Sequence, residues 1–176
     1  MKKVIHYLYA IQIAILCLFS FNLSAVAQQQ QVTQPGDLTL GAGLSYGSKV
    51  GHLENSEIGI TFHLLYMITA SIRGGVDYTY YFIGENDLGA SEMNLNGHYF
   101  IRNRDNLMIY GLGGLNLSRI NADSDVWGNV SSNKIGINAG IGIEFDLRNF
   151  ALFGEPKFTL GGWNQLQATA GLRLRI

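Results

Sequence analysis

The sequence is poor in the features that identify many protein classes. Its 176 residues include one cysteine, two prolines and only 14% charged residues, with a formal net charge of −1. A single cysteine excludes a disulfide-stabilised scaffold. The small net charge excludes a strongly basic nucleic-acid-binding protein, and the hydrophobic fraction of 47% excludes a disordered tail. The length suits a single domain.

Glycine, in contrast, is abundant. There are 22 glycines, about 12% of the residues against roughly 7% in an average protein. Most of them lie within alternating segments rather than between them. We interpret these glycines as positions where neighbouring side chains are crowded.

The first 27 residues predict a cleaved signal peptide. Met1-Lys2-Lys3 provides a positive start, residues 4–21 are mostly apolar, and Ala25-Val26-Ala27 forms a small-residue cleavage site. The polar residues 28–31 that follow disfavour a transmembrane helix. We therefore expect export, cleavage after Ala27 and a short N-terminal tail over residues 28–36.

The rest of the chain alternates between apolar and polar residues, which predicts β-strands rather than helices. In residues 166–176, for example, every even position is apolar. The predicted strands cover about 37–48, 56–66, 69–82, 91–102, 107–118, 133–147, 150–160 and 165–176. Short connections alternate with longer ones, except for a short last connection over residues 161–164. This pattern predicts an all-β, eight-stranded antiparallel up-and-down barrel within residues 37–176.

Two kinds of barrel fit this alternation, a soluble carrier with an apolar interior and a membrane barrel with an apolar exterior. The polar face is mainly Gly, Ser, Thr and Asn with a few charges of both signs, whereas a water-facing surface would be rich in Lys and Glu. The membrane barrel is therefore favoured, and the charges would form a network in the lumen that consists of Arg73, Asp77, Glu92, Glu144, Asp146, Glu155, Lys157, Arg173 and Arg175.

Aromatic residues on the apolar face fall near both ends of the predicted strands. One band near the longer loops comprises Tyr46, Tyr80, Phe82 and Phe158. A second band near the short turns comprises Tyr66, Tyr99, Tyr110 and Phe145. Two such bands are typical of a protein that spans a bilayer. Because hydrocarbon does not tolerate an open sheet edge, the first and last strands should pair with each other.

These features resemble the small outer-membrane β-barrels of Gram-negative bacteria, represented by OmpX and the transmembrane domain of OmpA and also described as a porin-like family or outer membrane protein beta-barrel domain. The resemblance is carried by the alternating segments 110–115, 138–145, 153–158 and 172–176. It implies a location in the outer membrane, contact with outer-membrane lipid and insertion by the barrel-assembly machinery. The family usually ends in an aromatic residue, from which Ile176 departs.

Two positions interrupt the alternation. Around Gly113-Gly114 the apolar positions change face, so we expect a β-bulge there that keeps Tyr110 and Leu115 on the lipid side. Pro156 lies within the seventh predicted strand and lacks a backbone donor, so we expect a bulge or a locally missing hydrogen bond.

The sequence predicts no catalysis. Outside the signal peptide there are three histidines, His52, His63 and His98, and none belongs to a Ser–His–acid set on the lipid-facing rim. We expect His63 and His98 to point inward as polar lumen groups. No metal-ligand spacing and no phosphate-binding glycine loop is present, so we expect no cofactor.

Three functions remain open for such a barrel. The paired charges could plug the lumen of a protein with a structural or surface-interaction role, which we favour. They could instead line a narrow, low-conductance channel for ions or small solutes. A lipid-modifying enzyme is the least favoured. The longest loop, 119–132, contains Trp127 and is the candidate binding site for a surface ligand.

Overall fold

The computed structural model describes residues 34–50, 56–83, 88–104, 106–122 and 130–176. The predicted signal peptide with its cleavage site, most of the N-terminal tail, and both His52 and Trp127 lie outside the described residues. Within the described ranges, no helix is long and apolar enough to cross a membrane.

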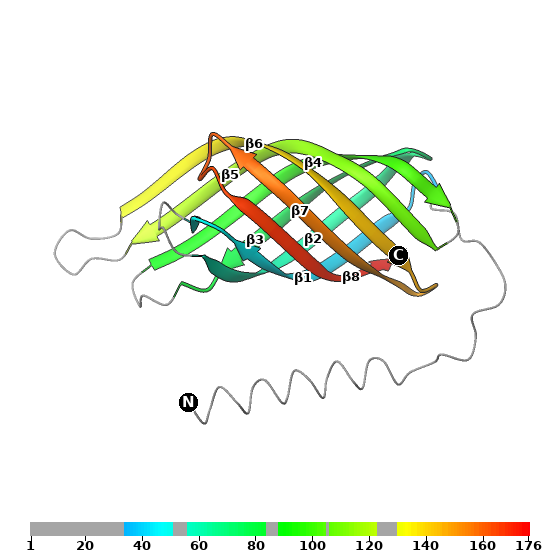
Figure 1. The fold of residues 1–176 in the computed structure, drawn as a ribbon, viewed down its shortest axis with the longest axis horizontal. Helices are drawn as coiled ribbons and strands as arrows, with labels where there is room; N and C mark the ends of the chain where they lie inside the picture. Colours follow the sequence, from blue (N-terminus) through cyan, green and yellow to red (C-terminus); the bar gives the residue numbers. More distant parts are fainter. Residues whose placement is uncertain (1–33, 51–55, 84–87, 105, 123–129) are drawn as a thin grey trace, which may run out of the picture. The chain divides into compact units, whose positions relative to one another are not determined.

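Eight antiparallel strands form a closed barrel in which each strand pairs with its neighbours in sequence and β8 pairs with β1 (Figure 1). This confirms the predicted architecture. The strands are β1 (Leu38–Gly47), β2 (Glu57–Thr69), β3 (Ile72–Tyr81), β4 (Leu88–Arg104), β5 (Leu107–Ala122), β6 (Val130–Asp146), β7 (Phe150–Leu160) and β8 (Leu166–Arg175).

The barrel has a turn end and a loop end. Short connections follow β2, β4 and β6 at the turn end, where β1 begins and β8 finishes. The connections after β1, β3, β5 and β7 lie at the loop end. The central strands β4, β5 and β6 are longer than predicted, since their pairing continues toward the loop end as far as Leu88↔Ala122 and Ala122↔Val130.

The first turn lies later in the chain than expected. β2 continues to Thr69, and the turn is formed by residues 70–71 rather than by residues 67–68. The Thr69 hydroxyl accepts hydrogen bonds from the backbone N–H groups of Ser71 and Ile72, at 3.3 and 3.1 Å. These bonds close the turn, because a threonine hydroxyl competes locally for backbone donors.

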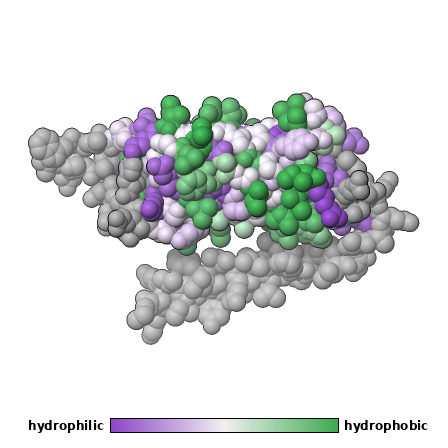
Figure 2. Space-filling view, turned by 45° about the horizontal axis from the view of Figure 1, so that its top comes forward, coloured by the Kyte–Doolittle hydropathy of each residue, from purple (hydrophilic) through white to green (hydrophobic). Residues whose placement is uncertain are grey.

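Side chains alternate between the interior of the barrel and its outer surface. Leu44, Leu95 and Ile141 point outward and are 58–62% exposed, and hydrophobic residues are exposed on the outside of the barrel in Figure 2. Charged and amide side chains, including Arg73, point inward and are buried. The predicted orientation is therefore the one observed.

The predicted bulge at Gly113-Gly114 is wrong. β5 pairs with β6 without a register shift from Leu107 to Ala122, and its pairing with β4 is regular through Gly113 and Gly114. Tyr110 and Leu112 point into the interior. The Tyr110 ring lies over Gly142 of β6, where a Cβ atom would lie 2.1 Å from the ring. Register shifts occur instead between Phe100 and Arg102 in β4 and near the end of β2.

Of the two irregularities expected at Pro156, the structure has the locally missing hydrogen bond and not the bulge. The pairing of β6 with β7 is interrupted between Gly140↔Lys157 and Ile143↔Gly154, with the same register on both sides. On its other side Pro156 pairs with Ala168 of β8. The missing donor therefore faces β6, and no residue is inserted.

Candidate functional site

The interior of the barrel is the candidate site because the chain's buried charges gather there. Every second side chain of each strand points inward, so eight strands stack their inward residues in successive layers. From the loop end to the turn end, these layers are an apolar cap, a polar middle and an ion cluster that is partly covered by a second apolar group.

The ion cluster consists of Arg73, Glu144, Glu155 and Arg173. Arg173 contacts Glu144 at 2.7 Å and Glu155 at 2.9 Å, and Arg73 contacts Glu144 at 3.0 Å. All four side chains are at most 3% exposed. Burial of charges is tolerable when they are paired and hydrogen-bonded.

Aromatic rings support this cluster. Tyr110 donates a hydrogen bond to Glu155 at 2.7 Å and accepts one from Arg173, also at 2.7 Å. The Arg173 guanidinium lies 4.0 Å from the centre of the Phe153 ring, a favourable cation–π distance. Tyr110 thus has an interior role and is not part of the lipid-facing aromatic band in which we predicted it.

His63 and His98 both point into the interior. Arg73 lies against His98 Nδ1, with its Nε 3.3 Å and its Nη2 3.1 Å away. The His98 ring stacks on Tyr110 with a centroid distance of 4.8 Å. His63 packs edge-on against Phe153 at 5.0 Å. Both histidines are surrounded by ring and guanidinium groups, and neither lies beside a serine nucleophile in the described residues.

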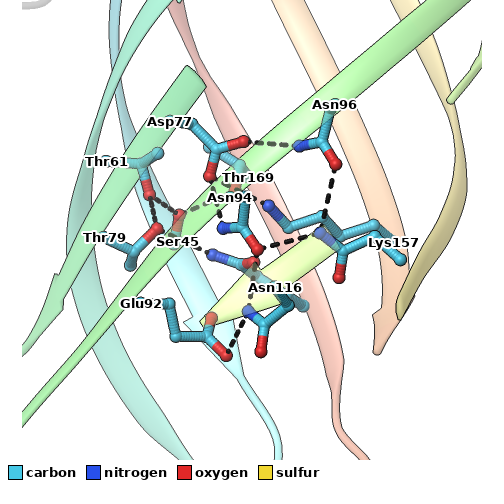
Figure 3. Close-up of polar contacts among 12 residues, drawn as sticks. Ser45, Thr61, Asp77, Thr79, Glu92, Asn94, Asn96, Asn116, Lys157 and Thr169 are labelled. Carbon is cyan, nitrogen blue, oxygen red and sulfur yellow. Dashed lines mark hydrogen bonds and ion pairs between the residues drawn. The ribbon is translucent and has the colours of Figure 1, made fainter. Parts of the chain in front are cut away.

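A second ion pair lies in the polar middle. Lys157 Nζ is 3.0 Å from Asp77 Oδ1. The same carboxylate accepts hydrogen bonds from Asn94 at 2.6 Å and from Asn96 at 2.7 Å (Figure 3). Asn138 donates to the side-chain oxygens of Asn94 and Asn96. The amides extend the network across β4, β5 and β6.

We counted asparagine among the residues of the polar face but named only charged residues as members of the lumen network. Asn94, Asn116 and Asn138 occupy inward positions on three adjacent strands, and Asn94 is directly opposite Asn116. They lie on the same inward face of the alternating pattern as the charged residues, and this signal could have identified them. The same holds for a row of hydroxyls on β8, β1, β2 and β3, in which Thr169, Ser45, Thr61 and Thr79 are hydrogen-bonded in succession.

Glu92 differs from the other buried acids because it has no cationic partner. It accepts hydrogen bonds from Tyr81 at 3.0 Å, Ser118 at 3.2 Å and Asn116 at 3.3 Å. In the described part of the chain, no Lys, Arg or His nitrogen forms an ion pair with it. All members of the predicted charge network except Glu92 therefore form direct ion pairs.

An apolar cap lies over Glu92 at the loop end and consists of Val50, Tyr81, Ala90 and Trp163. All four side chains are at most 3% exposed. Trp163 belongs to the short β7–β8 connection, which contains positive φ angles at Gly161 and Asn164. The sequence predicts only a short connection over residues 161–164, and the tryptophan within it is the signal that could have indicated a buried role.

The turn end is only partly covered. Met67, Phe100, Met108 and Leu112 form an apolar group with Tyr110 on one side. On the other side, Arg175 contacts Asp146 at 2.7 Å and lies 3.9 Å from Asp37. A small hollow of about 10 Å³ there reaches Glu144 and Arg173. That volume corresponds to roughly one water molecule.

The other seven residues of the two predicted aromatic bands point outward. Exposed aromatic side chains occupy both ends of the outer surface: Tyr46, Tyr80, Phe82 and Phe158 toward the loop end, and Tyr66, Tyr99 and Phe145 toward the turn end. Between them lie aliphatic residues such as Leu95 and Ile141.

The described residues contain no group of three or more His, Cys, Asp or Glu side chains that could hold a metal ion. Among the described residues, four buried side-chain atoms have no hydrogen-bond partner, namely His63 Nε2, Gln165 Oε1, Gln167 Oε1 and Arg173 Nε.

The sequence matches no known family profile and no curated protein sequence. Solved structures nevertheless resemble the barrel. Neisserial surface protein A (NspA) aligns with 81% of this chain and 97% of its own, with a TM-score of 0.63 and 16% identity. The N-terminal β-barrel domain of Pseudomonas aeruginosa OprF aligns with 81% of this chain and 98% of its own, with a TM-score of 0.61 and 17% identity.

A third similar structure is Ail, the attachment invasion locus protein of Yersinia pestis. It aligns over its full length with 81% of this chain, with a TM-score of 0.59 and 16% identity. Identities this low carry information about the fold and not about individual residues. With its closed antiparallel sheet and apolar exterior, the chain has the fold of the small eight-stranded outer-membrane β-barrels.

Proposed function

We propose that this protein is an integral outer-membrane β-barrel with a structural or surface-interaction role, a plugged polar lumen and no catalytic activity. The observation that carries the proposal is the inside-out distribution of side chains on a closed sheet. Large apolar residues face outward on all eight strands, while the inward ionic residues are buried and, except for Glu92, form ion pairs. A soluble carrier barrel would have the reverse distribution.

The height of the apolar surface supports a membrane location. On β6 the outward apolar side chains extend from Phe145 to Ile135 and are followed by Asn133 and Ser131. At about 3.3 Å per residue, this segment is about 33 Å long along the strand. With a strand tilt of about 40°, its height is about 25 Å, which is the height of the apolar band of outer-membrane barrels.

The filled interior supports a plugged lumen. The layers between Trp163 and Met108 contain side chains that contact one another, and an eight-stranded barrel is normally just wide enough to be filled in this way. A channel is the second candidate because the turn-end hollow reaches the ion cluster.

The loop end supports a surface-interaction role. β5 and β6 continue beyond the apolar band, and their outward residues there are polar, including Arg119, Asn121 and Asn133. The similar barrel Ail is named the attachment invasion locus protein, which supports a surface-interaction role. We propose that residues 119–132 contribute the contact surface.

Two experiments test the architecture and the lumen. Folded chain extracted in detergent should migrate faster on a gel before heating than after it, and it should fractionate with outer membranes. Purified chain in planar bilayers should give no current above background. Stable single-channel currents that change in Glu155→Ala and Lys157→Ala variants would favour the channel instead.

The surface role needs its own test. Deletion of residues 121–130 should abolish adhesion or phage binding of cells that express the protein, while heat-modifiable migration is retained. Unchanged binding in a correctly folded deletion variant would contradict a contact through this loop.

A further inference from the structure

In the loop-end half of the interior, acidic side chains outnumber basic ones. Near the turn end, Arg73, Arg173 and Arg175 match Glu144, Asp146 and Glu155 in number. Nearer the loop end, the charged residues are two acids, Asp77 and Glu92, and one base, Lys157. Because Lys157 is 3.0 Å from Asp77, one negative charge remains, on Glu92.

Two buried amide oxygens in the same region lack a donor. Gln165 and Gln167 are 0% exposed, and their Oε1 atoms have no hydrogen-bond partner among the described residues. Gln165 Nε2 donates to Tyr81 Oη at 3.2 Å, and the Tyr81 hydroxyl in turn donates to Glu92 at 3.0 Å. Gln165 is therefore linked to Glu92 by a single hydroxyl group. Gln167 lies two residues further along the chain, points inward from β8 and donates to Thr79.

We propose that this region binds one monovalent cation, Na⁺ or K⁺, between the Glu92 carboxylate and the amide oxygens of Gln165 and Gln167. Carboxylate and carbonyl oxygens are the ligands that hard cations prefer, and carbonyl oxygens replace the hydration shell of such ions in proteins. A single positive charge balances the interior. A divalent ion would leave an excess of one positive charge.

The site has two requirements, which are neutralisation of the Glu92 charge and a partner for each amide oxygen, and other occupants do not meet both. A proton on Glu92 would neutralise the carboxyl group but supply only one donor, so at least one of the two amide oxygens would remain without a partner. A water molecule could donate to the amide oxygens and would leave the buried charge unpaired, which is costly in a low-dielectric interior. A cation meets both requirements. The cap formed by Val50, Tyr81, Ala90 and Trp163 lies over this region and would shield the ion from the loop end.

Thermal unfolding tests the proposal, because a ligand that binds only the folded state raises the unfolding midpoint. The folded protein in detergent is heated in NaCl, in KCl and in N-methylglucamine chloride at equal ionic strength, which holds general charge screening constant. We expect a saturable rise of the midpoint, by several degrees, with Na⁺ or K⁺ and none with the bulky organic cation. Equal midpoints in all three salts would overturn the proposal.

Variants assign the effect to the site. Glu92→Gln removes the charge, keeps the side-chain shape and should abolish the dependence on Na⁺ or K⁺. Glu57→Gln, at the loop end of β2, is the matched control and should retain it. If Glu92→Gln does not fold, Gln165→Met should weaken the dependence, since it removes one amide oxygen. Retention of the full dependence in the site variants would overturn the assignment.

Crystals grown with Rb⁺ provide a direct readout that does not depend on stability. The anomalous scattering of Rb⁺ should give a peak between Glu92 and Gln165. A density at this position that is identical in Rb⁺ and N-methylglucamine crystals would identify a water molecule and overturn the proposal.

Discussion

At the scale of single residues, large interior side chains pack against glycines of other strands. Tyr110 lies over its cross-strand partner Gly142, and Tyr81 lies over Gly47, where added Cβ atoms would be 2.1 and 2.8 Å from the rings. The narrow barrel can hold buried tyrosines because these glycines leave room for them. This packing accounts for part of the unusual glycine content.

Gly142→Ala should therefore destabilise the barrel. The new methyl group would overlap the Tyr110 ring, and overpacking of a filled interior costs about 1–3 kcal/mol. Gly111→Ala is the control, because nothing lies within 4 Å of its added Cβ, and its stability should be unchanged or slightly higher. The free energy of unfolding in urea measures both. Equal effects of the two substitutions would contradict the packing described here.

The second residue-scale prediction concerns Arg173. Arg173→Met removes the only cation within 4.0 Å of Glu155 in the described chain, whereas Glu144 keeps Arg73. Loss of one partner of a buried pair costs about 3–5 kcal/mol. Arg175→Gln, at a side chain that is 21% exposed, should cost at most about 1 kcal/mol.

A compensating substitution distinguishes charge from packing in this prediction. Glu155→Gln combined with Arg173→Met removes both charges and should recover part of the lost free energy of unfolding, measured in urea. If the double variant is as unstable as the sum of the single variants, the ion pair does not carry the effect.

At the scale of the strand, two faces with opposite requirements define each element. β4 has Leu95 on its lipid face, 58% exposed, between the inward residues Asn94 and Asn96, which are 1% and 3% exposed. A shift of one residue would move the amides into lipid, so the register is strongly specified.

Leu95→Arg should be poorly tolerated. An arginine on the lipid face costs about 2–4 kcal/mol near the bilayer midplane and about 0–1 kcal/mol near the interface. Ser91→Arg, on the same face of β4 but closer to the loop end, is the matched control. Refolding into lipid vesicles from urea gives both values, and a cost that does not depend on depth would contradict a membrane-spanning β4.

At the scale of the whole molecule, closure of the barrel depends on the pairing of β1 with β8. Leu44 and Ala170 are directly opposite each other in that pairing and point outward. Cross-strand partners are close enough for a disulfide bond. In the predicted mature chain there is no native cysteine, since Cys17 lies in the signal peptide.

Oxidation of a Leu44→Cys, Ala170→Cys double variant should therefore form a disulfide bond in the folded protein. The product should resist the gel shift that heating causes when it is run without reductant. A Leu44→Cys, Leu95→Cys pair on β1 and β4, which are not paired, should not form an intramolecular bond. Absence of the β1–β8 bond in folded protein would contradict closure.

The sequence by itself determined the number of strands, their order and the face that points outward. These properties follow from local alternation. They also follow from the pairing of every backbone N–H and C=O group within the protein, which is required because hydrocarbon offers no hydrogen-bond partner. The inward direction of Arg73, Asp77 and Arg173 could be predicted for the same reason, since side-chain parity is a property of each strand alone.

Only the tertiary structure decided which inward groups meet. Partners such as Arg173 and Glu155, or Lys157 and Asp77, come from different strands, and their contact depends on stagger and on depth within the barrel. The same is true of Trp163, which is buried only because β3 and β4 bring Tyr81 and Ala90 beneath it. The predicted position of Tyr110 on the lipid face was wrong. The local alternation favoured that face, but the space over Gly142 on the next strand accommodates the ring in the interior. Local periodicity carries no information about such space.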